Sequence, residues 1–347
     1  MKKIVIHKPG GYERLVLEEH PDRAPGAGEV VIAVEAAGLN YADCCVRWGV
    51  YESAKKYVGW PITPGFEVAG RVKAIGPGVT RWKIGDPAMG ITLFNGYATE
   101  VKIPEDQIFT IPRGFTAAEA AGFPAVFMTA YHALHQIVRV RAGGKLLVHS
   151  AAGGVGTAIL QLARAAGYET VGVVGSAHKI EAAKKFGATH VIDKSSADLW
   201  REAERLAPGG YDLVLDANGA ETLRESYRHV APTGKLIAYG SHTILPKSGD
   251  RFGGRLNYVK VVSGLIRTPW FSPFKLLSEN RTVAGFNLSF LFDRNDLLTE
   301  GMTALLAGVD AGKIFPPATT LYPLAEVGRA HAAIESGKTV GKLILTT

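Results

Sequence analysis

One short run of residues constrains the fold of this chain more than any other: residues 149–156 read HSAAGGVG. The four residues before it, KLLV at 145–148, suit a buried strand, and residues 157–166 after it carry apolar side chains at helical spacing. A strand, a glycine turn and a helix in this order form the setting that a dinucleotide-binding site requires. The run therefore predicts a nucleotide-binding α/β unit in the middle of the chain.

The glycines of this run have separate expected tasks. Gly153 permits a tight turn, and Gly156 lets the helix pack closely against the strand. Gly154 keeps side-chain bulk away from a pyrophosphate, which would bind to free N–H groups at the positive end of the helix. Ala151 stands where the first glycine of the usual pattern would be. We predict that the pyrophosphate contacts come from Ala152, Gly153, Gly154, Val155 and Gly156.

The residues after the next strand indicate which dinucleotide binds. Residues 169–174 read as this strand, and NAD sites usually place an Asp or Glu near its end to hold the ribose 2′-hydroxyl. Here residues 175–179 contain no acid; Ser176 can donate to a 2′-phosphate and Lys179 can neutralise it. We therefore predict NADPH. The alternative is that Lys179 is only a solvated residue in the first turn of the following helix.

The distribution of strand-like and helix-like runs predicts two structural units. Over roughly the first 120 residues, short apolar runs alternate with Gly and Pro, which is typical of a β-rich, barrel-like unit. From residue 145 strands and helices alternate, and this predicts an α/β fold with a doubly wound parallel sheet (a Rossmann domain). The later strands are expected at residues 191–193, 213–216, 235–240 and 282–286. The tail from residue 304, with two helices and a strand at 342–345, is expected to return to the first unit.

Composition is that of a soluble globular protein, with 47% hydrophobic and 20% charged residues. The two cysteines, Cys44 and Cys45, are adjacent and indicate a reducing compartment, and no apolar run approaches the roughly 18 residues that span a bilayer. We expect a cytoplasmic protein. The net charge of +7 comes from largely scattered residues and is attributed to solvated surface charge plus a phosphate-bearing cofactor. A nucleic-acid partner is not predicted.

Four motifs along the chain together resemble one protein family. They are AGLNYAD at 37–43, TPGFEVAG at 63–70, GD at 85–86, and AAGGVG at 151–156 with Gln161 and Arg164. Over nearly its whole length the chain is similar to the medium-chain dehydrogenases/reductases, specifically the zinc-free quinone oxidoreductase (zeta-crystallin-like) group. Residues 274–281 and 285–288 also resemble the vesicle amine transport protein branch of that group.

The resemblance implies how the chain divides and assembles. A discontinuous GroES-like domain would comprise residues 1–124 and 289–347, and a Rossmann NADPH-binding domain would comprise residues 125–288. The substrate would lie in the cleft between them. Relatives pair the strand that corresponds to residues 282–286 with its copy, so a homodimer is implied.

Further cofactor contacts are expected outside the glycine run. Asn218 and Tyr239 follow or end strands of the parallel sheet, and so would lie at its carboxyl edge, where open α/β sheets bind ligands. The resemblance adds Thr129, Phe286, Asn287 and Lys342. For Thr129 the alternative is ordinary helix packing.

A metal is not expected in this chain. Zinc-dependent relatives carry a His in the place of Phe66, and no Cys lies beyond Cys45 to complete a site. Because a catalytic zinc needs about three side-chain ligands and one open position, we predict zinc-independent chemistry. His132 and His135, at helical spacing, are interpreted as one face of a helix.

Without a metal, hydride transfer needs an acceptor that is already electrophilic. Quinones and α,β-unsaturated carbonyl compounds qualify, so we predict an NADPH-dependent reductase of hydrophobic small molecules of this kind. Hydrogen bonds to the developing oxyanion are assigned to Asn40, Tyr41 and Tyr51. For Asn40 and Asp43 the alternative is helix capping. The rival interpretation of the chain is a non-catalytic NADPH-binding protein that acts at a membrane surface or on RNA.

The segment from residue 242 to residue 279 mixes basic and aromatic residues, and apolar residues at 256, 259, 262 and 266 indicate an amphipathic helix. Three interpretations compete: a lid over the substrate cleft, a membrane-surface helix, and a nucleic-acid surface. A packed lid or interdomain helix is favoured.

Overall fold

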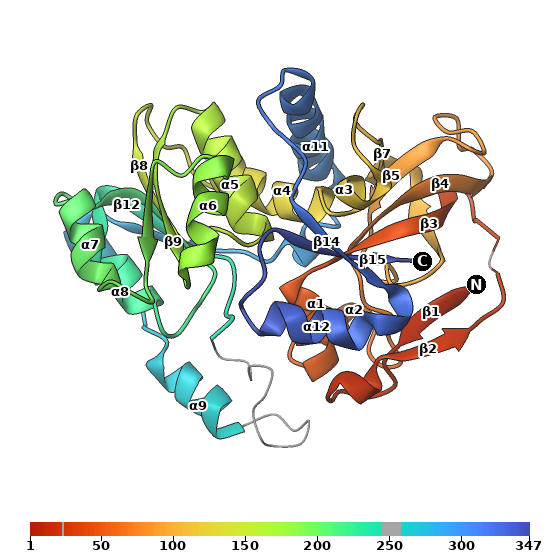
Figure 1. Ribbon diagram of the computed structural model, residues 1–347, viewed down its shortest axis with the longest axis horizontal. Helices are drawn as coiled ribbons and strands as arrows, with labels where there is room; N and C mark the ends of the chain where they lie inside the picture. The colour runs from red at the N-terminus through yellow and green to blue at the C-terminus, as the bar shows by residue number, and fades with distance from the viewer. Residues whose placement is uncertain (23, 244–257) are drawn as a thin grey trace.

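Two β-sheets organise the chain (Figure 1). The computed structural model describes residues 1–22, 24–243 and 258–347. One sheet has six strands and the other has seven, and a hairpin of β1 (Lys2–Val5) and β2 (Val16–Glu19) lies beside the second. The part of the chain that the structure describes holds no helix long and apolar enough to cross a membrane.

The six-stranded sheet is parallel throughout, in the order β10-β9-β8-β11-β12-β13. The chain builds outward from β8 to β10 and then crosses back to place β11 on the other side of β8. This reversal creates a switch point at the carboxyl ends of β8 and β11, where open sheets bind ligands. The predicted doubly wound parallel sheet is confirmed. Its strands are β8 (Lys145–Val148), β9 (Glu169–Val174), β10 (His190–Asp193), β11 (Tyr211–Asp216), β12 (Val230–Ala238) and β13 (Thr282–Gly285).

Helices cover both faces of this sheet, because successive side chains of a strand point to opposite faces. Leu146 and Val148 of β8 belong to the same hydrophobic cluster as the apolar residues of α5 and α6. Leu147, between them, belongs to the cluster of α7 and α8. The helices are α5 (Gly154–Ala165), α6 (Ile180–Phe186), α7 (Leu199–Leu206) and α8 (Leu223–Arg228).

The seven-stranded sheet joins residues from both ends of the chain. Its order is β14-β15-β3-β4-β5-β7, with β6 also on β3; β14 and β15 are parallel and the other pairs antiparallel. Leu343 of β15 lies opposite Leu39 of β3, so the tail returns to the first unit as predicted. The strands are β3 (Glu29–Leu39), β4 (Glu67–Ile75), β5 (Pro87–Ile91), β6 (Glu100–Pro104), β7 (Ile108–Thr110), β14 (Thr319–Pro323) and β15 (Lys342–Thr346).

The helices of this half connect it to the parallel sheet. They are α1 (Tyr41–Trp48), α2 (Glu52–Tyr57), α3 (Ala117–Ala121), α4 (Pro124–Tyr131), α11 (Asn295–Asp310) and α12 (Val327–Glu335). The tail helix starts at Asn295, well before the predicted residue 304. Gly301, inside α11, is a contact point with α4: a Cβ there would lie 2.6 Å from Cε of Met128.

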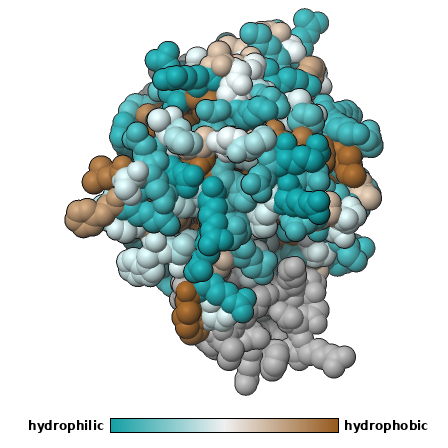
Figure 2. Space-filling view, turned by 90° about the vertical axis from the view of Figure 1, so that its left-hand side faces the viewer, coloured by the Kyte–Doolittle hydropathy of each residue, from teal (hydrophilic) through white to brown (hydrophobic). Residues whose placement is uncertain are grey.

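The segment after β12 forms α9 (Tyr258–Arg267) and α10 (Pro273–Glu279), and α9 projects from the body of the molecule (Figure 1). Val262 and Ile266 of α9 are 52% and 78% exposed, and Trp270 is 98% exposed. The predicted amphipathic helix exists, but the packed lid is wrong for its described part, because these apolar side chains face solvent. Residues 244–257 of the same segment lie outside the described residues. Figure 2 shows a largely hydrophilic face from which a few hydrophobic side chains stand out.

Candidate active site

The glycine turn lies between β8 and α5, at the switch point of the parallel sheet. Its left-handed residue is Ser150 (φ 54°), whereas Gly153 has an ordinary φ of −81°, so the turn does not use the freedom predicted for Gly153. Gly156 is required by space, because a Cβ there would lie 2.3 Å from the Ser150 carbonyl oxygen. Gly153, Gly154 and Val155 are partly exposed, and the first N–H groups of a helix have no acceptors within it. These N–H groups suit a pyrophosphate.

Cationic side chains gather where β9 ends. Lys179 is 9% exposed, and its Nζ donates to the carbonyl oxygen of Gly337 at 2.6 Å. Burial and, to a lesser degree, the positive charge of Lys194 lower the pKa of Lys179. The alternative in which Lys179 is a solvated residue is therefore wrong. Two neighbouring ammonium groups repel each other unless an anion binds between them. A 2′-phosphate would be such an anion.

Two further polar side chains, Ser176 and His178, lie in the same loop as Lys179. The Oγ of Ser176 lies 3.2 Å from Nδ1 of His178, whose Nε2 lies 3.0 Å from the carbonyl oxygen of Lys338. The contributions of His178 and Lys194 were missed in the sequence. His178 lies within the loop that was singled out, but Lys194 follows β10, and only the neighbouring position of β10 and β9 brings it close.

The loop after β11 is held beside the glycine turn. Ser150 Oγ donates to Oδ1 of Asn218 at 3.0 Å. Oδ1 of Asp216, the last residue of β11, accepts from the backbone N–H groups of Asn218 at 2.8 Å and Gly219 at 3.0 Å. Asn218 therefore lies at the carboxyl edge of the sheet, as predicted from its position after a strand.

Tyr239 and Phe286, both expected to contact the cofactor, lie together at this edge. Their rings are stacked with centroids 6.4 Å apart, and His132 from the end of α4 meets Phe286 edge-on at 4.8 Å. The Tyr239 hydroxyl is buried and has no hydrogen-bond partner in the described part of the chain. Burial raises the pKa of Tyr239 above its ordinary value, so the hydroxyl keeps its proton. A buried hydroxyl without a partner is a position that a bound ligand can satisfy.

The two tyrosines assigned to the cleft bridge the two halves of the molecule. The Tyr41 ring lies 4.2 Å from the His242 ring, and its hydroxyl donates to the His242 carbonyl oxygen at 3.2 Å. The Tyr51 hydroxyl donates to Oδ1 of Asn287 at 2.8 Å. Burial raises the pKa of Tyr51 to about 12 and lowers the pKa of His242 to about 4. Tyr51 and Asn287 are thus brought together, and His242 is a neighbour that the sequence did not reveal.

Asp43 has the capping role that was its alternative. Its Oδ2 accepts from the backbone N–H of Asn40 at 2.8 Å and from the Tyr97 hydroxyl at 2.9 Å, and its Oδ1 accepts from the N–H of Gly65. Burial raises the pKa of Asp43 to about 6. Asn40 is the N-cap residue of α1 and forms a capping box with Asp43. Its side chain also has other partners: its Nδ2 donates to Glu67, and its Oδ1 accepts from Lys342. Asn40 itself is partly exposed.

Two expected cofactor residues use their polar groups inside the protein. The ammonium of Lys342 has acceptors in Asn40, Glu67 and the carbonyl group of Leu39, so any ligand contact is left to its methylene groups. Those methylenes lie beside the glycine turn, since a Cβ at Gly154 would be 3.4 Å from Cδ of Lys342. Oγ1 of Thr129 donates to the carbonyl oxygen of Ala125 one turn earlier in its helix, at 2.7 Å.

The surroundings of Phe66 are apolar. Its ring lies 5.1 Å from that of Phe94 and 5.7 Å from that of Tyr51. Burial raises the pKa of Cys45 to about 12, so this thiol stays protonated. Over residues 1–22, 24–243 and 258–347, no three His, Cys, Asp or Glu side chains are arranged to hold a metal ion.

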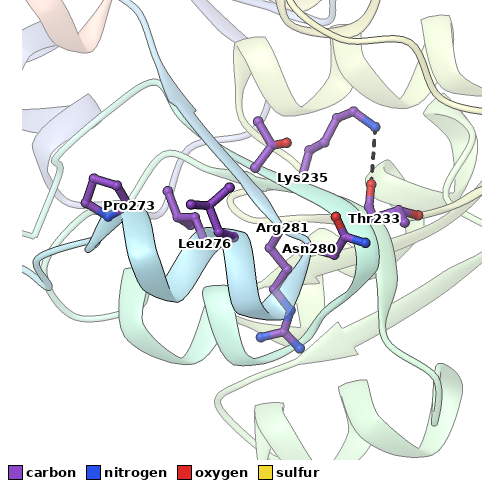
Figure 3. Close-up of a pocket in the computed structure, with 8 residues that line it drawn as sticks. Thr233, Lys235, Pro273, Leu276, Asn280 and Arg281 are labelled. Atoms are coloured by element: carbon purple, nitrogen blue, oxygen red, sulfur yellow. Dashed lines mark hydrogen bonds between the residues drawn. The ribbon is translucent and has the colours of Figure 1, made fainter.

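A groove of about 530 Å³ lies away from this site, between α10 and the outer strand β13. Figure 3 shows Lys235 and Thr233 together at one end of it, with Pro273 and Leu276 along α10. The glycine turn and Asn40 do not line this groove, so it is a separate surface feature at the sheet edge.

Comparison with protein families matches two regions of the chain. The alcohol dehydrogenase GroES-like domain matches residues 26–142, and the zinc-binding dehydrogenase family matches residues 186–345. The first match identifies the β-rich half as GroES-like, as the resemblance implied.

Similar proteins cover almost the whole chain. The synaptic vesicle membrane protein VAT-1 homolog of Rattus norvegicus is 35% identical over 99% of this chain and 84% of its own length. The 2-haloacrylate reductase of a Burkholderia species is 30% identical over 98% of this chain and 97% of its own length. The crystal structure of Escherichia coli quinone oxidoreductase complexed with NADPH has a TM-score of 0.85 and 26% identity, and each chain is fully covered.

Proposed function

Since the chain belongs to the medium-chain dehydrogenase/reductase family, in the VAT-1 branch of its quinone oxidoreductase-like group, we propose that it is an NADPH-dependent reductase of electrophilic small molecules. One observation carries the proposal. Tyr51 of the GroES-like half donates to Asn287 next to the carboxyl edge of the parallel sheet, and the contact of Asn40 with Lys342, both of the GroES-like half, lies close to the glycine turn. That edge is where a dinucleotide binds in this architecture.

NADPH is the cofactor that the binding residues suit. The pyrophosphate position is the glycine turn, and the 2′-phosphate position is the group of Ser176, His178, Lys179 and Lys194. When bound, NADPH supplies the hydride. The unpartnered hydroxyl of Tyr239 and the ring of Phe286 would border the same cofactor.

The protein supplies orientation and hydrogen bonds rather than a Lewis acid. We propose zinc-independent chemistry, which is supported by Phe66 in the place of a histidine ligand and by its apolar surroundings. A substrate oxygen that gains negative charge would accept from an Nδ2–H of Asn40 and from the hydroxyls of Tyr41 and Tyr51. Because burial raises the pKa of both tyrosines, they act as hydrogen-bond donors and not as phenolates. Each tyrosine must first exchange its present acceptor, His242 or Asn287, for the substrate.

The proposed substrates are quinones and α,β-unsaturated carbonyl compounds. The relatives support both classes, since one is named a quinone oxidoreductase and another a reductase of 2-haloacrylate, an activated alkene. Addition of hydride to either class places negative charge on an oxygen, which is the charge that the cleft donors would stabilise. We propose that this cleft lies between a GroES-like domain (residues 1–124 and 289–347) and a Rossmann domain (residues 125–288), in a cytoplasmic protein with free Cys44 and Cys45.

The first experiment measures oxidation of NADPH and NADH by chelator-treated protein with a panel of quinones and enones. Turnover that survives chelation, with NADPH strongly preferred, is expected. Turnover lost on chelation and restored by zinc would contradict the metal-independent mechanism. A preference for NADH would contradict the assignment of the 2′-phosphate site and leave the reductase proposal standing.

The second candidate is a non-catalytic NADPH-binding protein that acts at a membrane surface or on RNA. The exposed apolar side chains of Val262, Ile266 and Trp270 favour the membrane form of this alternative. Tight NADPH binding without turnover of any acceptor, together with sedimentation on vesicles that contain anionic lipid, would select it over the reductase.

We further propose a homodimer that forms through β13. This strand ends the order of the six-stranded sheet, and no strand of the described chain covers its outer side. Unpaired N–H and C=O groups of an edge strand are a template for pairing with a second chain. The groove of Figure 3 lies directly beside it, lined by Leu277 and Thr282.

A further inference from the structure

A buried ion pair lies within the seven-stranded sheet, close to the glycine turn. Nζ of Lys342, the first residue of β15, lies 2.6 Å from Oε1 of Glu67, the first residue of β4. Both side chains are almost completely buried, with 2% and 0% exposure. Replacing such pairs by apolar residues is often neutral or stabilising, because their desolvation offsets their attraction. A contribution to fold stability is therefore a weak explanation for this pair.

The pair determines which way the amide of Asn40 faces. Nζ of Lys342 can only donate, and it lies 2.6 Å from one end of the amide, which must be the oxygen. Oε1 of Glu67 can only accept, and it lies 2.9 Å from the other end, which must be the nitrogen. The ammonium and the carboxylate thus fix the same orientation. A flipped amide would place its NH₂ group against the Lys342 ammonium and its oxygen against the Glu67 carboxylate.

One N–H of Asn40 is left for the cleft. The Nδ2 group has two hydrogens, and Glu67 takes one of them. Asn40 is partly exposed while Glu67 and Lys342 are buried, so the second hydrogen is the one that a ligand on the solvent-accessible side of this cluster would reach. A donor held in advance at that position costs little reorganisation when charge develops on a substrate oxygen.

The same cluster is fixed to the elements that would carry the cofactor. Oε2 of Glu67 accepts from the backbone N–H of Ala125 at 2.7 Å, at the start of α4. Gly341, directly before Lys342, bridges to Gly153 and donates its N–H to the carbonyl oxygen of Ala152 at 2.8 Å. The position of Asn40 is therefore tied through Lys342 to the glycine turn.

We propose that Glu67 and Lys342 are positioning residues for hydride transfer, which hold the Asn40 amide so that its free N–H points at the oxygen of the hydride acceptor. The inference rests on the proposed reductase function and adds two residues that act only through Asn40. In this proposal the ammonium of Lys342 orients Asn40 toward the substrate, and the methylene groups of Lys342 lie beside the cofactor.

The test is a coupling experiment on kcat with the best acceptor of the wild-type protein. It compares Asn40→Ala, the charge-neutral pair Glu67→Gln/Lys342→Met, and the combination of all three. We expect Asn40→Ala to lower kcat about 100-fold, as loss of one oxyanion donor does, and the pair to lower it about 10- to 100-fold through misplacement. The triple variant should match Asn40→Ala within about twofold, with the Kd for NADPH changed less than about threefold throughout.

Independent action would overturn the inference: either the two effects multiply in the triple variant, or the pair leaves kcat unchanged. The partly buried pair variant Glu29→Gln/Lys102→Met removes a 2.8 Å ion pair of the same seven-stranded sheet and serves as the matched control, with unchanged kcat. If the buried pair variant does not fold, the isosteric Glu67→Gln in the wild-type and Asn40→Ala backgrounds gives the same coupling. A wild-type protein without turnover on any acceptor would instead refute the proposed function, and this inference with it.

Discussion

At the residue scale, the proposed cofactor preference rests on a few side chains at the end of β9. Lys179 combines burial with a 2.6 Å contact to a carbonyl oxygen, so its ammonium is held in place before any ligand arrives. Preorganised cations bind phosphate more strongly than mobile ones, since less side-chain freedom is lost on binding. Discrimination between NADPH and NADH is therefore expected to depend on this residue.

Replacing Lys179 by Met should weaken NADPH binding about tenfold or more, because a charge-assisted hydrogen bond contributes roughly 1.5–3 kcal/mol. The Kd for NADH should change less than about twofold. Both constants can be measured by fluorescence titration. Lys184→Met is the matched control, since that ammonium is exposed on α6 and pairs with Glu181. Equal weakening of both cofactors would show that Lys179 acts through the fold instead.

A second residue-scale prediction concerns His242 and the pH dependence of stability. Burial lowers its pKa to about 4, below the ordinary value of 6.5, so the folded state favours the neutral ring. Its contribution to the free energy of unfolding is therefore complete above pH 6.5 and is lost as the pH falls through 4. His242→Phe keeps a ring beside Tyr41 and should reduce the loss of stability between pH 7 and pH 4 by roughly 3 kcal/mol at most.

Urea denaturation of both proteins at several pH values measures this difference, and comparison with the wild type cancels the other histidines. Identical pH profiles for His242→Phe and the wild type would mean that the ring titrates normally and that the Tyr41 contact does not bury it.

At the element scale, the strand–turn–helix unit of β8 and α5 was predictable because its signal is local. A continuous apolar run ends in glycines that a short loop and a close helix require, and these features lie within one stretch of sequence. One detail of the prediction was wrong: Ser150, and not Gly153, adopts the left-handed backbone conformation. Gly156 remains the glycine that space requires.

Gly156→Ala should therefore destabilise the protein by about 1–3 kcal/mol, the usual range for added bulk in a packed position, and weaken NADPH binding. Gly209→Ala is the control, because a Cβ there would meet nothing within 4 Å and its φ is not positive. Thermal or denaturant unfolding and NADPH titration give the two readouts. A Gly156→Ala protein as stable as Gly209→Ala would show that the turn can shift to accept the methyl group.

The helices were less predictable than the strands, because periodicity does not say what a face packs against. The apolar spacing of α9 indicated a helix, but Val262 and Ile266 face solvent instead of a cleft. The tail was predicted to begin at residue 304, whereas α11 begins at Asn295 and contains Gly301. In the structure that glycine lets α11 approach Met128 of α4, a contact that no local pattern encodes.

At the scale of the whole molecule, the site could be predicted only in part. Residues at strand ends, such as Asn218 and Tyr239, were found because parallel strands share one carboxyl edge. The contacts of Tyr51 with Asn287 and of Lys342 with Glu67 join residues more than 200 positions apart. The first pair depends on how the two halves meet, and the second on how the tail returns to the seven-stranded sheet. The sequence therefore suggested that Asn287 and Lys342 contact the cofactor, but not which residues they contact.

The proposed dimer is tested at this same scale. Light scattering should give a mass of twice 37.0 kDa at micromolar concentration. Thr282→Lys, which adds a charge to the exposed edge strand β13, should shift the protein toward monomer. Thr320→Lys, on the edge strand β14 of the other sheet, is the control and should leave the mass unchanged. A monomeric wild type would refute the dimer and leave the reductase proposal intact.

The position of β15 has a consequence for how the protein acquires its activity during synthesis. Leu343 pairs with Leu39, and Lys342 donates to Asn40. The surroundings of Asn40 are therefore complete only after residues some 300 positions later in the chain have been synthesised. A ribosome-bound chain that ends before residue 341 therefore lacks both β15, which joins β14 to β3 in the seven-stranded sheet, and Lys342, the lysine proposed to orient Asn40. Contacts this distant in sequence carry a loop-closure cost that slows folding. Competence for the proposed hydride transfer is thus expected only after residues 342–346 have been synthesised and have paired with β3.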